Sequence, residues 1–332
     1  MASSDGLVPR RPSYRLSFRR AVFIIGACAW AACVAQVYAQ DAVSDKQSTD
    51  AKLPRWARAE NARALAARSG ARLTRAAANR TSIADTNIDD DKPQFNELLN
   101  PQGVAIDPVE RRLYVTDTAR QSVFEETREG GLRKVGSGFM VPQAVAVDGT
   151  GNVYVADSQA GVIYKVTPDG TQSTVGSGFF MPMSVALDGI GNVYAADPWN
   201  GFVARIAPDG TQTNLGSGYN SPVGVAVDGL GNVYVADTYN AVVYKIASDG
   251  TQTTVGSGFV APMYVAADAA GNVFVTDTGT ESVVRIDPTG SVTTIKSGLN
   301  VPIGLALDRD SKLYVVDSFS RKIITIDAKR AL

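Results

Sequence analysis

The stretch GNVYVADT at residues 231–238 is one of six similar stretches that recur at a constant interval. The aspartate of each stretch lies 40 residues after the previous one. These repeat aspartates are Asp117, Asp157, Asp197, Asp237, Asp277 and Asp317. The repeat prolines follow nearly the same period, at Pro101, Pro142, Pro182, Pro222, Pro262 and Pro302. Self-similarity at a period of about 20–50 residues is typical of repeat architectures, so we expect an array of similar units.

The unit from Pro222 to Ala261 predicts four strands, because runs of β-branched residues alternate with turns rich in glycine, asparagine and aspartate. The runs are residues 224–228, 233–237, 242–246 and 252–255. Helical periodicity is absent from this half of the sequence, which argues against helical repeats. Four short strands within about 40 residues form one blade of a β-propeller.

The phrases P-x-G-V-A-V-D and G-N-V-Y-V-A-D-T, followed by a strand that contains Lys or Arg, resemble the NHL repeat family. The resemblance covers residues 94–327, recurs six times and implies an all-β, six-bladed propeller of four-stranded blades. A WD40 propeller fits less well because no unit carries a Trp-Asp pair, and a seven-bladed ring lacks a seventh copy. NHL propellers commonly act as interaction or sensor domains, so the resemblance also implies binding.

The predicted propeller spans residues 93–332, and its last blade is incomplete in sequence. The blades lie near residues 101–141, 142–181, 182–221, 222–261, 262–301 and 302–327. Only three strands are visible after residue 302. We expect residues 94–99 to supply the fourth strand by pairing with residues 322–326, because closure hides the sheet edges. The alternative is that residues 94–99 form a simple leading loop.

Residues 1–39 predict a signal peptide, because five arginines precede an uncharged run that ends in Val37-Tyr38-Ala39. This pattern favours an exported protein, periplasmic or extracellular. The alternative is a membrane anchor formed by residues 21–39. Both cysteines, Cys28 and Cys33, lie in this run, so the exported part has no disulfide.

Residues 40–92 predict a flexible linker that is first rich in alanine and arginine and then acidic. Its arginines are at positions 55, 58, 63, 68, 72, 75 and 80, opposed in that stretch only by Glu60. A solvated spacer is the favoured interpretation, and contact of residues 1–80 with a membrane or envelope polymer is the alternative. Residues 93–332 contain 17 Lys and Arg against 24 Asp and Glu, a net charge of −7, which argues against nucleic-acid binding.

The chain contains no histidine. Histidine-dependent nucleophiles, histidine-ligated zinc and the histidine mechanisms of related propeller lyases are therefore excluded. We expect no cofactor and no catalytic residue. The alternative function is a carboxylate- or metal-dependent hydrolase or lyase of the lactonase-like propeller type, which needs a cluster of acidic residues at the channel mouth.

The repeat aspartates are expected to be structural, because every blade carries one. An aspartate at the end of a strand can accept backbone N–H bonds and so hold the next turn. We also expect them to pair with Lys165, Arg205, Lys245 and Arg285, which follow eight residues later in four blades. A ring of metal-binding carboxylates is the alternative.

Binding residues are expected where the repeat is broken, on the face shared by the loops before the first strand and the loops between the second and third strands. The candidates are Trp199, Tyr239, Phe319, Phe180, Met183, Met263, Tyr264, Arg120 and Arg321. Gathered aromatic and Met side chains mark binding surfaces. Phe139, Phe179, Tyr219 and Phe259 instead hold one repeated position, so we expect them to pack between blades. The sequence thus predicts an exported, monomeric propeller that binds a protein or small ligand.

Overall fold

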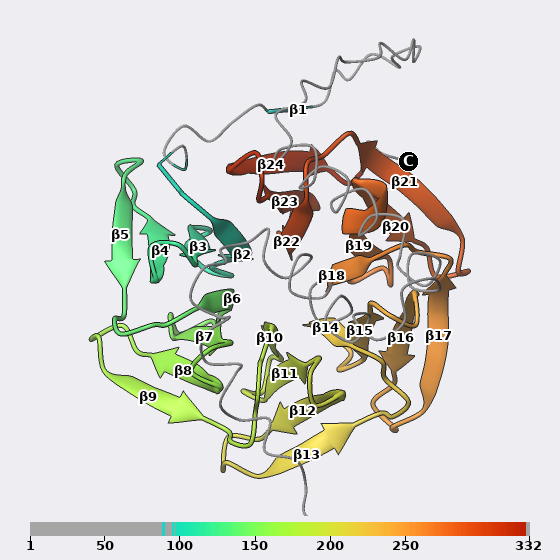
Figure 1. Cartoon of the computed structure of the whole chain (residues 1–332), viewed down its shortest axis with the longest axis horizontal. Helices are drawn as coiled ribbons and strands as arrows, with labels where there is room; N and C mark the ends of the chain where they lie inside the picture. Colours follow the sequence, from blue (N-terminus) through green and yellow to red (C-terminus); the bar gives the residue numbers. More distant parts are fainter. Residues whose placement is uncertain (1–87, 90–94, 96, 330–332) are drawn as a thin grey trace, which may run out of the picture.

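The computed structural model describes residues 88–89, 95 and 97–329, which form a ring of six antiparallel four-stranded sheets (Figure 1). The sheets surround a common axis, with their last strands at the rim (Figure 1). The predicted all-β, six-bladed propeller is confirmed. One 3-10 turn, η4 (Thr278–Thr280), lies between two strands of the fifth sheet.

The blades are numbered in chain order. Blade 1 contains β2 (Pro101–Ile106), β3 (Leu113–Asp117), β4 (Ser122–Glu126) and β5 (Leu132–Val135). Blade 2 contains β6 (Pro142–Val147), β7 (Val153–Asp157), β8 (Val162–Val166) and β9 (Gln172–Val175). Blade 3 contains β10 (Ser184–Leu187), β11 (Val193–Asp197), β12 (Phe202–Ile206) and β13 (Gln212–Leu215). Blade 4 contains β14 (Pro222–Val227), β15 (Val233–Asp237), β16 (Val242–Ile246) and β17 (Gln252–Ser257). Blade 5 contains β18 (Pro262–Ala267), β19 (Val273–Asp277), β20 (Ser282–Ile286) and β21 (Val292–Ser297). Blade 6 contains β22 (Pro302–Leu307), β23 (Lys312–Asp317), β24 (Lys322–Asp327) and β1 (Ile88–Asp89).

The second strand of each blade explains the unbroken apolar runs of the repeat. Every residue of β15 is buried, and the same holds for β3, β7, β11 and β19. Both sides of such a strand are covered, because each sheet packs between two neighbouring sheets. Phe139 and Phe259 are buried, and Phe139 packs with Val135 of blade 1 and Val166 of blade 2, as expected for residues between blades.

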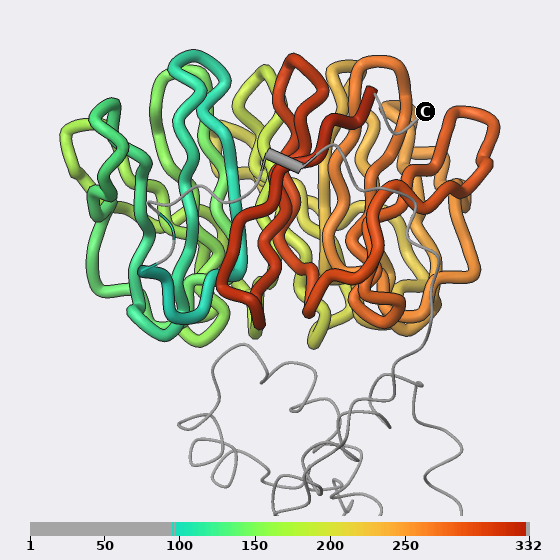
Figure 2. The backbone as a smooth tube through the Cα atoms, turned by 90° about the horizontal axis from the view of Figure 1, so that it is seen from above, coloured from blue at the N-terminus to red at the C-terminus, as the bar shows by residue number. Residues whose placement is uncertain are grey.

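Strands cross the thickness of the ring, so their connections gather on two faces (Figure 2). The loop face carries the residues before each first strand and the loop between the second and third strands, which in blade 4 are residues 219–221 and 238–241. The turn face carries the two remaining connections, which in blade 4 are residues 228–232 and 247–251. On the loop face the Thr238 N–H donates to the carbonyl of Ser221 at 3.0 Å, so the two loops of a blade are in contact.

The ring closes at blade 6, but not through the predicted segment. β1 pairs antiparallel with β24, with Ile88 opposite Ile326 and Asp89 opposite Thr325. The prediction that residues 94–99 form this strand is wrong, since residues 95 and 97–99 form turns. Phe95 and Leu98 are instead buried against blades 1 and 6. The residues that do pair with β24 lie inside the predicted linker 40–92.

The predicted signal peptide or anchor of residues 1–39 lies outside the described residues, as does the arginine-rich stretch 55–80. Among the residues that are described, none belongs to a helix with the length and hydropathy needed to cross a membrane.

Candidate functional site

The six repeat aspartates hold the loop face together. Each accepts a hydrogen bond from the backbone N–H of the residue two positions before the repeat proline of its blade. Asp157, for example, accepts from Met140 at 2.6 Å, Val141 at 2.9 Å and Ala160 at 3.1 Å. A buried carboxylate that accepts several N–H groups satisfies donors that would otherwise be unpaired. The side chains are thus engaged within their own blades.

Burial has an electrostatic cost at two of these positions. Burial raises the pKa of Asp237, and hydrogen bonds from Asn220 and Asn240 only partly oppose it. Burial likewise raises the pKa of Asp317. Across the described part of the chain, no three His, Cys, Asp or Glu residues lie close enough to hold a metal ion.

The cations of the third strands do not pair with the repeat aspartates, so that expectation is wrong. Lys165 lies directly across from Tyr154, with its ammonium 5.5 Å from the ring centroid, and Lys245 lies over Tyr234 at 5.8 Å. The register places Val162 opposite Asp157. An eight-residue separation therefore places the cation opposite an aromatic residue three positions before the aspartate, and the two lysines form cation–π contacts there.

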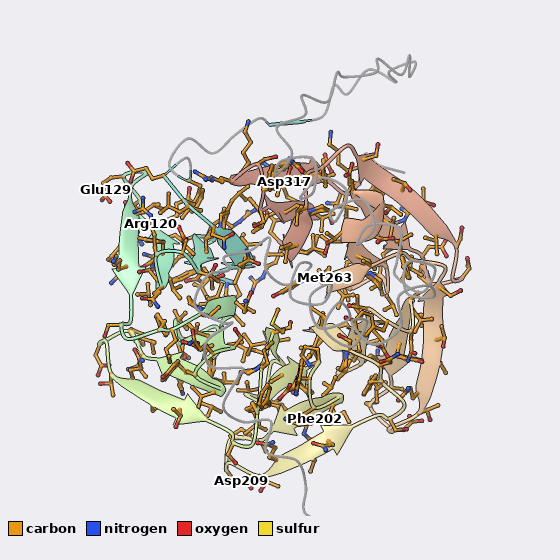
Figure 3. All side chains as sticks on the ribbon, viewed as in Figure 1. Arg120, Glu129, Phe202, Asp209, Met263 and Asp317 are labelled. Carbon is orange, nitrogen blue, oxygen red and sulfur yellow. The ribbon has the colours of Figure 1, made fainter. Side chains whose placement is uncertain are left out.

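Three predicted binding residues are buried near the axis of the ring instead of being exposed on the loop face. Met183, Met263 and Tyr264 are buried, and Met263 lies near the centre of the ring (Figure 3). The Tyr264 hydroxyl donates to the backbone oxygen of Met183 at 2.6 Å, which joins blade 5 to blade 3. The innermost strands also approach closely, since a Cβ on Gly224 would overlap the backbone of Met263. The prediction that these three side chains are exposed is wrong, because first strands converge on the axis.

Five large apolar side chains are exposed on the loop face. Phe180 and Trp199 are both 50% exposed and stack on one another, with centroids 5.4 Å apart and ring planes at 23°. Phe319 of blade 6 is 61% exposed. Leu99 and Met140, which lead into blades 1 and 2, are also exposed. We call these five residues the apolar arc, because they follow blades 6, 1, 2 and 3 around the ring.

The remaining predicted residues of this face are polar or half-buried. The Tyr239 ring is half-buried, and its N–H donates to the carbonyl of Asn220 at 3.1 Å. The Arg120 guanidinium donates to the carbonyl of Glu97 at 2.7 Å and lies 3.7 Å from Asp117. Arg321 is exposed and has a positive φ of 58°. The structure places Arg120 in a local contact that orders the loop before blade 1.

A second set of aspartates was missed by the sequence analysis. Asp228, in the turn between the first two strands of blade 4, accepts from Asn232 Nδ2 at 2.7 Å and from the Tyr234 hydroxyl at 3.1 Å. Its equivalents are Asp107, Asp148, Asp188, Asp268 and Asp308. In Asp148, burial raises the pKa, but hydrogen bonds from Asn152 and Thr150 outweigh it and lower the pKa overall. The same 40-residue spacing in the phrase G-V-A-V-D could have identified them.

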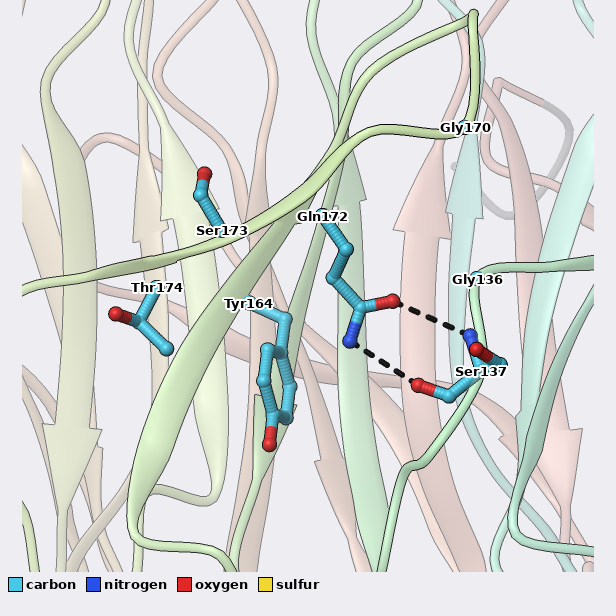
Figure 4. A pocket seen from close by; sticks show the side chains of 7 residues that line it. All are labelled: Gly136, Ser137, Tyr164, Gly170, Gln172, Ser173 and Thr174. Carbon is cyan, nitrogen blue, oxygen red and sulfur yellow. Dashed lines mark hydrogen bonds between the residues drawn. The ribbon is translucent and has the colours of Figure 1, made fainter.

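Two clefts lie away from the apolar arc. One, of about 730 Å³, opens between blades 1 and 2 beside Tyr164 (Figure 4). There the Gln172 amide donates to the Ser137 carbonyl at 3.0 Å and accepts from the Ser137 N–H at 3.2 Å, which clasps the two blades (Figure 4). The other cleft, of about 530 Å³, lies on the turn face between blades 4 and 5.

Residues 219–241 match the NHL repeat. Together with the six-bladed ring, this match confirms the resemblance seen in the sequence. A search of curated proteins found no match.

Solved structures of propeller enzymes share the fold. Virginiamycin B lyase from Staphylococcus aureus is 14% identical, with a TM-score of 0.57 over 68% of this chain and 80% of that one. A gluconolactonase from Xanthomonas campestris is 16% identical, with a TM-score of 0.61 over 69% of this chain and 86% of that one. Likeness at this identity establishes a common fold and leaves the activity open.

Proposed function

We propose that this chain is an exported propeller that binds a protein partner through the apolar arc of the loop face and catalyses no reaction. The observation that carries the proposal is the stacked pair of Phe180 and Trp199, half of whose surface faces solvent. Exposed aromatic side chains are enriched at protein interfaces and often supply most of the binding energy. The pair lies on a rigid scaffold, because Asp197 accepts from the Phe180 N–H at 2.6 Å.

The form of the surface favours a protein over a small ligand. Small molecules bind in concave sites that enclose most of their surface, whereas the apolar arc is spread over four blades. Met183, Met263 and Tyr264 are buried rather than exposed beside the arc, and the Tyr264 hydroxyl bonds the Met183 carbonyl. Export is proposed from the signal-peptide pattern of residues 1–39.

Capture of partners from the native envelope fraction tests the proposal. The wild-type protein should retain a stoichiometric partner, and Phe180→Ala and Trp199→Ala should each lose it with an unchanged melting temperature. Val109→Ala is the matched control, because Val109 is an exposed aliphatic on the turn face. Equal capture by all four proteins, or no partner for the wild type, would contradict the proposal.

A hydrolase or lyase is the second candidate, and the fold shared with a gluconolactonase and a lyase favours it. If the protein is such an enzyme, the rate of lactone turnover should be proportional to protein concentration, with or without added divalent cations. The two candidates are separable, because the enzyme would keep its turnover when Trp199 is replaced.

A further inference from the structure

The turn face carries a cleft that has no part in the proposed binding through the apolar arc. It lies between blades 4 and 5, has a volume of about 530 Å³, and is lined by apolar side chains that include Val255 and Ile286. Leu230 lies at its edge and is 79% exposed. Such a combination of cleft and exposed aliphatic side chain is suited to an apolar group from another segment.

The aliphatic side chains at this face are not needed by the turns that carry them. Ile190 of blade 3 is 81% exposed and holds the same turn position as Leu230. The equivalent position is Val109 in blade 1, Thr150 in blade 2, Ala270 in blade 5 and Asp310 in blade 6. The turn itself is held by its aspartate, as when Asp228 accepts from the Leu230 N–H at 2.9 Å. Two neighbouring blades therefore present large aliphatic groups where the fold accepts a small or polar one. We call Ile190, Leu230 and the cleft the turn patch.

The charge around the turn patch indicates what would cover it. The six connections on this face of blades 3, 4 and 5 contain no lysine or arginine. Their carboxylates are Asp188, Asp209, Asp228, Asp249, Asp268 and Asp287. The cleft lining includes one cation, Lys245, against three of these carboxylates. A partner for this surface should be basic and should carry a few large apolar side chains.

The chain contains a segment of this chemistry. Residues 55–80 hold seven arginines and one glutamate, together with Trp56, Leu65 and Leu73. The segment is also within reach, because it ends eight residues before β1, which pairs with β24 of blade 6 next to blade 5. Eight extended residues span about 26 Å, which exceeds the radius of gyration of about 17 Å expected for a domain of this size. A tethered segment also has a high effective concentration.

We propose that residues 55–80 dock on the turn patch of their own chain, with arginines against the turn carboxylates and an apolar side chain in the cleft. The loop face would then remain open, while the basic segment is withheld from anionic surfaces. Such docking is sensitive to ionic strength, since the Debye length falls from about 10 Å at 0.1 M salt to about 3 Å at 1 M.

Limited trypsin cleavage of the protein purified from its envelope fraction tests the proposal, with mass spectrometry to locate the cuts. At low salt, Asp209→Asn with Asp249→Asn should speed cleavage at the arginines of residues 55–80 by about three- to tenfold, as expected for losing two exposed ion pairs. Asp169→Asn is the matched control. Asp169 occupies the same exposed turn in blade 2 and accepts from the Thr171 N–H at 3.0 Å, as Asp209 does from Thr211 at 2.9 Å.

A second double substitution tests the apolar part of the turn patch. Ile190→Thr with Leu230→Thr introduces the residue that blade 2 has naturally and should also speed cleavage, whereas Val109→Thr in blade 1 should not. Cleavage that is equal in all variants and insensitive to salt overturns the proposal. Protection that rises with protein concentration, together with a dimer in light scattering, also overturns it, because the segment would then dock on a second copy. Unchanged melting temperatures exclude unfolding as the cause of faster cleavage.

Discussion

Replacing Tyr219 with Phe should make the protein more stable. Tyr219 occupies the position held by phenylalanine at Phe139, Phe179 and Phe259. Its ring packs edge-on against Tyr244, with centroids 5.8 Å apart and planes at 67°, much as Phe139 packs against Tyr164 at 5.5 Å and 67°. The Tyr219 hydroxyl is buried and has no hydrogen-bond partner among the described residues. Its surroundings leave little room, because a Cβ on Gly216 would overlap it.

The magnitude follows from the cost of burying an unpaired hydroxyl. A buried donor without a partner costs about 1–3 kcal/mol, and Tyr219→Phe removes that cost. The lost oxygen atom also made van der Waals contacts, and their loss offsets a small part of the gain. Burial raises the pKa of Tyr219, so the hydroxyl stays neutral and no charge effect is added near pH 7. We therefore expect Tyr219→Phe to raise the free energy of unfolding by about 1 kcal/mol. For a domain of this size, that corresponds to an increase of about 2–4 °C in Tm.

Urea denaturation and thermal melting at fixed pH and salt measure this change. The matched control is Phe139→Tyr, which places a hydroxyl in the equivalent packing of blade 2 and should lower the free energy of unfolding by about 1–3 kcal/mol. A loss of 1 kcal/mol or more in Tyr219→Phe would refute the reasoning, because it would mean that the hydroxyl has a partner such as a buried water.

Three further predictions concern the axis and the two aspartate sets. Tyr264→Phe removes the same atom as Tyr219→Phe but should lower stability by about 1–3 kcal/mol, because the Tyr264 hydroxyl pairs with the Met183 carbonyl; an unchanged urea midpoint would count against it. Asp237→Ala should lower stability by about 1–3 kcal/mol, since the half-buried Asn220 N–H and the Asn240 amide lose their acceptor; a Tm within error of the wild type contradicts this. At Asp188, burial raises the pKa, but hydrogen bonds from Asn192 outweigh it and the pKa is lowered. Its contribution is therefore complete above the unfolded pKa of about 4 and is lost as the pH falls through the folded pKa, so the stability deficit of Asp188→Ala should be largest at pH 7 and shrink below pH ~4; a deficit independent of pH would be inconsistent with this assignment.

The structural role of the repeat aspartates could be predicted from the local sequence pattern. A residue that recurs in every unit at the end of a strand has the same neighbours each time, and Asp157 and Asp237 both accept backbone N–H groups of the loop face. The pairing of Asp157 with Lys165 failed for an equally local reason. In an antiparallel hairpin the position opposite a residue depends on the length of the connecting turn, and that register places Lys165 opposite Tyr154.

The closing strand was placed six residues too late in the sequence. Phe95 and Leu98 are apolar, as expected for a strand. They lie instead in a turn, and their side chains are buried between blades 6 and 1. The strand that pairs with β24 comes from Ile88 and Asp89, in a polar stretch with little β signal. An edge position needs backbone N–H and C=O groups more than a particular side chain, so its sequence signal is weak.

The number of blades, every strand except the one that closes blade 6, and the turns between strands could be predicted from the sequence. These follow from runs of β-branched residues and from turn chemistry within about 40 residues, and six copies repeat the same signal. Which of the variable residues face solvent depends on the tertiary packing of the blades. Phe180 and Met183 lie three positions apart, yet Phe180 is half exposed and Met183 is buried at the axis. The distance to the axis is set by six first strands that converge from blades far apart in sequence, and no local pattern contains that information.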